Sequence, residues 1–92
     1  MITESALVSR NDELLSAPVG EELAMMDIDA GTYYVLDDIG SFIWSSLAEP
    51  TCVADLLERL QERYDVTARR CSEDVLPLLE HLHEKGIVRV AT

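Results

Sequence analysis

The residue types that most often carry out chemistry are few in this sequence, and they are poorly placed to act together. His81 and His83 are the only histidines, and residues two apart on a helix point away from each other, so the pair could not easily share one ion. Cys52 and Cys71 lie far apart in the chain without a C-x-x-C companion, which is typical of unpaired, small buried residues. We therefore expect no metal site.

Catalytic motifs are also missing from the sequence. It contains no G-x-S-x-G, P-loop, G-x-G-x-x-G or H-E-x-x-H pattern, and both histidines lie on the polar side of a predicted helix. Asp37 and Asp38 form a carboxylate pair, but adjacent acids between a strand and a helix more often cap the helix. We therefore predict that the chain is not an enzyme, that it has no catalytic residue and that it needs no cofactor.

The charge balance indicates which partners are disfavoured. Eighteen acidic residues against seven basic ones give a formal net charge of −11. Such a surface repels nucleic-acid phosphates and anionic membranes, and it speeds the encounter with a basic partner. High acid content also aids solubility by itself, so the charge excludes nucleic acid and membrane more firmly than it identifies a ligand.

Length and hydropathy place the chain among small globular proteins. Its 92 residues fit one domain, residues 1–92, and 48% of them are hydrophobic. No apolar stretch approaches the roughly 18 residues of a membrane span, and residues 1–10 lack the apolar region of a signal peptide. The expected location is the cytoplasm.

The first third of the chain reads as β structure. Residues 13–18 and 22–28 are strand candidates, and residues 29–31 form a good hairpin loop because Gly31 can adopt a positive φ. Residues 32–36 are β-branched, aromatic or large apolar, which predicts the most secure strand of the chain. On such a strand Tyr34 and Leu36 share one face, whereas Tyr33 and Val35 share the other.

The remainder of the chain reads as helical. Asp38 is expected to cap a helix over residues 39–47, and Thr51 to cap a second amphipathic helix that runs to Tyr64. A third helix starts at Thr67 or Ser72, contains Pro77 as a kink, and ends at Gly86. A short strand or extended tail follows over residues 87–90. The predicted fold class is α+β and winged-helix-turn-helix-like, with a three-stranded antiparallel β-sheet followed by three α-helices.

These segments, in this order and spacing, resemble the PqqD-like proteins. The resemblance rests on the hairpin over residues 22–36, on Asp37-Asp38-Ile39-Gly40-Ser41-Phe42-Ile43-Trp44, and on the helical half that ends at Lys85-Gly86-Ile87-Val88. It covers about residues 13–90, and Asp37 stands where Asn is usual in the family. The resemblance implies a RiPP recognition element, a domain that binds the leader segment of a ribosomally made precursor peptide. The Tyr-Tyr hairpin looks most like the discrete recognition proteins of lasso-peptide clusters, which are similar in working beside a leader peptidase and a cyclase.

The resemblance also implies a binding mode and a set of site residues. The leader lies as an added strand beside the third strand, over a groove walled by the third helix. An unpaired sheet edge offers the main-chain groups for such pairing. The peptide-binding residues expected on this basis are Tyr33, Tyr34, Val35, Leu36, Asp74, Val75, Leu78 and Leu82. For several of them a place in the core is an equal alternative, Trp44 is expected in the core, and the net charge favours a leader with lysines or arginines.

Two alternative functions stay open at the level of sequence. A small acidic carrier protein would need a serine for phosphopantetheine, but Ser41 follows Gly40 and no Asp-Ser-Leu is present. A winged-helix transcription regulator fits the order of elements, yet neither candidate recognition helix, over residues 51–64 or 72–85, is basic.

Overall fold

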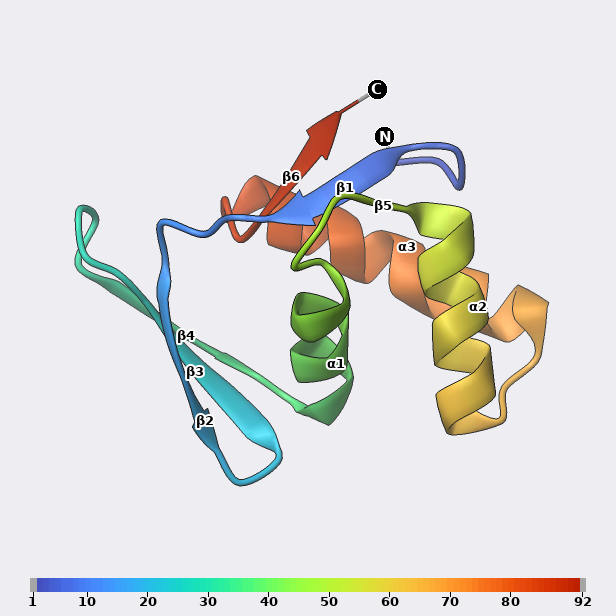
Figure 1. Cartoon of the computed structure of the whole chain (residues 1–92), viewed down its shortest axis with the longest axis horizontal. Coiled ribbons are helices and arrows are strands. Elements are labelled where there is room, and N and C mark those ends of the chain that lie inside the picture. The colour runs from blue at the N-terminus through green and yellow to red at the C-terminus, as the bar shows by residue number, and fades with distance from the viewer. Residues whose placement is uncertain (1, 92) are drawn as a thin grey trace.

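The computed structural model describes residues 2–91, which fold into two small sheets and three helices (Figure 1). In chain order the elements are β1 (Leu7–Arg10), β2 (Leu15–Val19), β3 (Glu22–Asp27), β4 (Thr32–Leu36), α1 (Asp38–Ser46), β5 (Thr51–Cys52), α2 (Val53–Tyr64), α3 (Ala68–Glu84) and β6 (Val88–Ala91). The predicted α+β class, with an antiparallel three-stranded sheet before three helices, is confirmed.

Two tight hairpins build the sheet β2-β3-β4. Gly20 (φ +65°) and Gly31 (φ +68°) occupy the left-handed backbone positions of the two turns, which glycine adopts without a steric cost. Met25 lies opposite Tyr34, and Leu23 lies opposite Leu36. The three predicted strands of this region are therefore confirmed, although the first begins two residues later than expected.

The helix starts differ in part from the sequence prediction. Asp37, not Asp38, caps α1, and its carboxylate accepts a hydrogen bond from the Gly40 N–H at 2.8 Å. Thr51 does not cap α2, because it lies in β5 and its hydroxyl donates to the Glu49 carbonyl at 2.9 Å. Cys52 occupies the cap position without a side-chain hydrogen bond. Both predictions were wrong by one residue. At α1 the two neighbouring aspartates are equally good caps in isolation, and at α2 the pairing of Thr51 in β5 delays the start of the helix.

Helix α3 is a single helix that starts at the earlier of the two predicted positions. The Thr67 hydroxyl accepts a hydrogen bond from the Arg70 N–H at 3.2 Å, so Thr67 is the N-cap and Ser72 lies inside the helix together with Pro77. Gly86, with a φ of +76°, ends it as predicted.

A second sheet, β5-β1-β6, was not predicted in this form. The final strand was anticipated, but residues 7–10 were not recognised as its partner. Val8 of β1 lies opposite Val90 of β6 and Thr51 of β5, which joins the two ends of the chain (Figure 1). Pairing over such a separation leaves no local pattern in the sequence, because each strand has only two to four residues.

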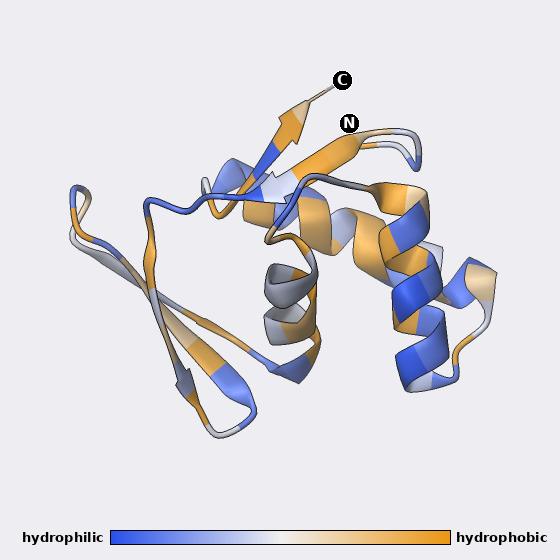
Figure 2. Ribbon diagram, in the orientation of Figure 1, coloured by the Kyte–Doolittle hydropathy of each residue, from blue (hydrophilic) through white to orange (hydrophobic). Residues whose placement is uncertain are grey.

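The hydrophobic core lies among the three helices, the sheet β5-β1-β6 and the inner face of β3 and β4. Trp44 is buried there as expected, under the Arg10 guanidinium at 5.4 Å from the ring centroid. Figure 2 shows α2 with a hydrophilic face toward the viewer and apolar residues along its edges. The largest fully buried side chains are Met25, Ile43, Leu47, Leu56, Leu60, Leu79, Ile87, Val8, Val53 and Val88. Within residues 2–91, no helix has the length and apolar character to cross a membrane.

Candidate functional site

Strand β4 forms a free edge of its sheet. The strand order β2-β3-β4 leaves β2 and β4 as the two outer strands. Strand β2 contains Pro18, which has no N–H to offer, and a proline in a strand is a common device that blunts an edge. All five residues of β4, in contrast, keep their N–H groups. Of these two edges, β4 is therefore the better template for an added strand.

The register identifies the main-chain groups that face outward from β4. Because Pro18 cannot donate, the Pro18–Leu23 pair must be one whose main-chain groups point away from each other. Leu23 then points its groups toward Leu36 of β4. Since such pairs alternate along an antiparallel ladder, the N–H and C=O groups of Tyr33 and Val35 point out of the free edge.

A groove separates this edge from helix α3. Its volume is about 480 Å³. Strand β4 supplies one wall and the last turns of α3 the other. The residues lining it are Glu22, Tyr33, Tyr34, Val35, Leu36, Asp37, Gly40, Leu78, His81, Leu82, Lys85 and Ile87. The structure thus brings six of the eight predicted site residues to one groove.

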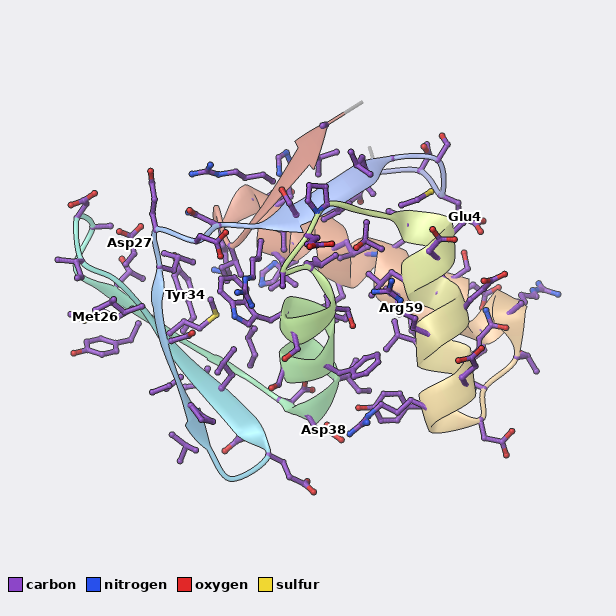
Figure 3. All side chains as sticks on the ribbon, viewed as in Figure 1. Glu4, Met26, Asp27, Tyr34, Asp38 and Arg59 are labelled. Carbon is purple, nitrogen blue, oxygen red and sulfur yellow. The ribbon has the colours of Figure 1, made fainter. Side chains whose placement is uncertain are left out.

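The side chains of β4 alternate between the groove side and the outer side. Figure 3 shows Tyr34 pointing toward the helices, whereas Met26 of β3 lies on the opposite side of the sheet. The Tyr34 hydroxyl donates to the Lys85 carbonyl at 3.5 Å, and Lys85 Nζ lies 5.8 Å from the Tyr34 ring centroid. Leu36 is buried. Tyr34 and Leu36 therefore support the floor, while Tyr33 and Val35 offer mainly their main chain to the groove.

A second, more apolar cavity of about 320 Å³ adjoins the first. Asp37 and Leu78 line both cavities. The remaining two predicted residues, Asp74 and Val75, line only this second cavity. Val75 and Leu82 are almost completely buried, so each packs in the core and presents little surface to either cavity. Other lining residues are Ile39, Leu60, Tyr64, Val66 and Cys71.

The histidines and cysteines lie in separate places. His81 is exposed on the groove wall, and His83 Nδ1 lies 3.4 Å from the Val88 carbonyl. Burial raises the pKa of the Cys71 thiol, and the nearby Asp74 carboxylate raises it further. Cys52 and Cys71 are both free thiols. Among residues 2–91, no three His, Cys, Asp or Glu side chains are grouped to hold a metal ion.

The outer face of the sheet β2-β3-β4 is apolar and exposed, which the sequence analysis missed. Its largest members are Leu15, Val19, Tyr33 and Val35, with Met26 between them on β3. A weak signal for it was present in the apolar residues 15, 17 and 19, which share one face of a strand, but such a set reads equally well as a buried face. Exposed apolar surface of this kind marks an interaction surface.

The alternative functions find little support in the geometry. Six strands are incompatible with an all-helical carrier protein. The arginines at the start of α3 pair with acids, Arg69 with Glu73 at 3.0 Å and Arg70 with Asp74 at 3.4 Å, so they do not form a free basic patch for DNA.

Comparisons with known proteins identify the family of the chain and a similar solved fold. A search of curated proteins found no match. A similar solved structure is described as TbiB1 in complex with the TbiA(beta) leader peptide. It is 27% identical, has a TM-score of 0.79, and the match covers 88% of this chain and 94% of the other. The family model described as coenzyme PQQ synthesis protein D (PqqD) matches residues 22–88, which include β3, β4 and all three helices, and the chain therefore belongs to the PqqD family.

Proposed function

We propose that this protein binds the leader segment of a ribosomally synthesised precursor peptide as a fourth strand on β4. The observation that carries the proposal is the free edge at Tyr33 and Val35, which lies beside a groove walled by α3. The similarity to a structure that contains a bound leader peptide supports it. No bond-making or bond-breaking step belongs to this role.

Recognition divides between main chain and side chains. Tyr33 and Val35 pair with the peptide main chain, which provides affinity that depends little on sequence. Alternate peptide side chains then point into the groove, where Tyr34 and Leu78 offer apolar contacts over a floor that the buried Leu36 and Leu82 support. Asp74 extends the contact surface into the second cavity, whose wall the largely buried Val75 supports. Specificity for the peptide sequence comes from these side-chain contacts rather than from the main-chain pairing.

We also propose that the bound leader is presented to a leader peptidase and a cyclase, as in lasso-peptide biosynthesis. Holding the leader raises the effective concentration of the attached core peptide near those enzymes. The exposed apolar face of β2-β3-β4 supports a protein partner, because the peptide occupies the edge and leaves this face free.

A fluorescence-anisotropy titration tests the proposed binding. The probe is a labelled leader segment of the precursor peptide encoded beside this gene, and a scrambled peptide of the same composition is the control. Saturable binding of the leader alone, at micromolar concentration or below, is expected. If no neighbouring precursor leader binds, the proposal is wrong.

Two substitutions at one position test the edge itself. Val35→Pro removes an outward N–H and is expected to weaken leader binding roughly tenfold or more, since a peptide carbonyl is left without its partner. Val35→Ala keeps the N–H and is expected to bind within about threefold of the wild type. Equal loss in both variants would mean that the Val35 side chain, rather than the edge, makes the contact.

A further inference from the structure

The charged side chains around the groove are sorted by sign along its length. Glu22 lies at the start of β3, and Asp37 follows the end of β4. Asp74 lines the second cavity, which adjoins this end of the groove through Asp37. Lys85 and His81 lie at the other end, where the last turn of α3 faces Tyr34. The groove therefore has an acidic end and a basic end.

The basic end is unusual for so acidic a protein. Lys85 is the only lysine in the sequence. It takes part in none of the four ion pairs found within residues 2–91, and its ammonium group lies 5.8 Å from the Tyr34 ring centroid. His81 precedes it by one helical turn on the same wall. A positive charge is thus held beside the groove without a carboxylate partner.

The acidic end keeps a net negative charge even though two of its three acids have partners. Asp37 accepts a hydrogen bond from the Gly40 N–H, which leaves its charge uncompensated. Asp74 lies 3.4 Å from the Arg70 guanidinium, so one of the three carboxylates is partly neutralised. Glu22 makes no ion pair within the part of the chain that the structure describes.

The distance between the acidic end and the basic end of the groove determines how far apart two charged residues of a bound peptide strand must lie. Asp74 and Lys85 are separated by eleven positions along α3, or about 16 Å at 1.5 Å per residue. A β-strand covers that distance in about five residues. Because only alternate side chains of an added strand point into the groove, the two matching peptide residues lie about four or six positions apart.

We propose that the groove selects a peptide with one basic residue and one acidic residue at this spacing, the basic residue at the Asp37–Asp74 end and the acidic residue at the Lys85 end. On a strand antiparallel to β4 the basic residue comes first. This inference rests on the proposed function, since it assumes a strand on β4. This local selection differs from a general attraction by the negative net charge of the protein, which would favour basic peptide residues at both ends of the groove.

A charge scan of the leader peptide tests the proposal. Each position of the synthetic leader from the neighbouring precursor gene is replaced in turn by Lys and by Glu, and each peptide is titrated against the wild type, Lys85→Glu and Asp74→Lys. We expect one position that prefers Glu and one that prefers Lys, each by about fivefold at low salt. Lys85→Glu should reverse only the first preference, and Asp74→Lys only the second.

Matched control variants separate local from global charge. Arg69→Glu and Glu73→Lys change the net charge as the two test variants do, but these residues line neither cavity. The controls should leave both preferences unchanged, and all preferences should shrink at 1 M salt. A preference for Lys at every position, or equal effects of the test and control variants, would overturn the proposed charge selection while leaving leader binding intact. Failure of the unmodified leader to bind would instead contradict the proposed function.

Discussion

The helices and the sheet β2-β3-β4 use apolar residues in opposite ways. Ile43, Leu56 and Leu79 on the helices are fully buried, whereas Leu15, Tyr33 and Val35 on the sheet are 56%, 72% and 66% exposed. Burial of apolar surface is the main source of stability in a small domain. The helical region therefore holds the fold together, while the sheet keeps its edge and its outer face available for partners.

The largest expected effect is a loss of stability in the helical region. Leu79→Ala removes a fully buried side chain from α3 and should lower the free energy of unfolding by about 2–5 kcal/mol. Its neighbour Leu78 is only half-buried and lines both cavities. Leu78→Ala should cost less stability but weaken leader binding roughly fivefold. Urea denaturation measures the loss of stability, and fluorescence anisotropy measures the loss of leader affinity. If both variants lost stability and affinity to the same extent, core and groove residues would not be distinct.

A substitution on the outer face of the sheet β2-β3-β4 should leave stability and leader affinity unchanged and affect only the proposed partner enzyme. Leu15→Lys introduces a charge on exposed β2, so stability should change by less than about 0.5 kcal/mol and leader affinity should stay the same. If the peptidase docks on this face, cleavage of the bound leader by the pathway's peptidase should slow by about tenfold. Leu7→Lys, at an exposed position on β1 that lines neither the groove nor the second cavity, is the control. Unchanged cleavage with Leu15→Lys would place the peptidase elsewhere.

The junction between the two regions depends on the cap of α1. Asp37→Ala should lower the free energy of unfolding by about 1 kcal/mol because the Gly40 N–H loses its acceptor. Asp37→Asn retains a capping oxygen and should stay within a few tenths of a kcal/mol of the wild type. Thermal or urea denaturation compares the two, and an equally large loss in the Asn variant would show that charge, not capping, is what matters.

The smallest effect concerns pH and the buried thiol of Cys71. Its pKa is raised in the folded state by burial and then by Asp74, so the folded protein holds this proton more tightly than the unfolded chain. The stabilising contribution is complete below the ordinary thiol pKa of about 8.5 and is lost as the pH rises through the higher folded value. The free energy of unfolding should thus fall between pH 8 and 10 more steeply for the wild type than for Cys71→Ala. Parallel pH profiles would contradict this.

Local patterns in the sequence predicted most of the fold and several of the residues that line the groove. The 3.6-residue stripe of α2, the strand Thr32–Leu36 and the helix stop at Gly86 are local features, and all three were predicted correctly. Pairing of β1 with β6 depends on residues about 80 positions apart, which no local pattern reveals. Likewise, Asp74 and Leu82 share a helix stripe with Leu78, but only the position of α3 across the groove from β4 shows that they reach different cavities. The charge difference between the two ends of the groove depends on the same arrangement.

Amide hydrogen exchange at β4 tests the central claim most directly. In the free protein the Tyr33 and Val35 amides face solvent and should exchange quickly, whereas the Tyr34 amide points toward β3 and should exchange slowly. Saturation with the leader peptide should slow exchange at Tyr33 and Val35 and leave Tyr34 unchanged. If the leader binds but Tyr33 and Val35 exchange as before, the peptide does not pair with this edge and the proposed mode of binding is wrong.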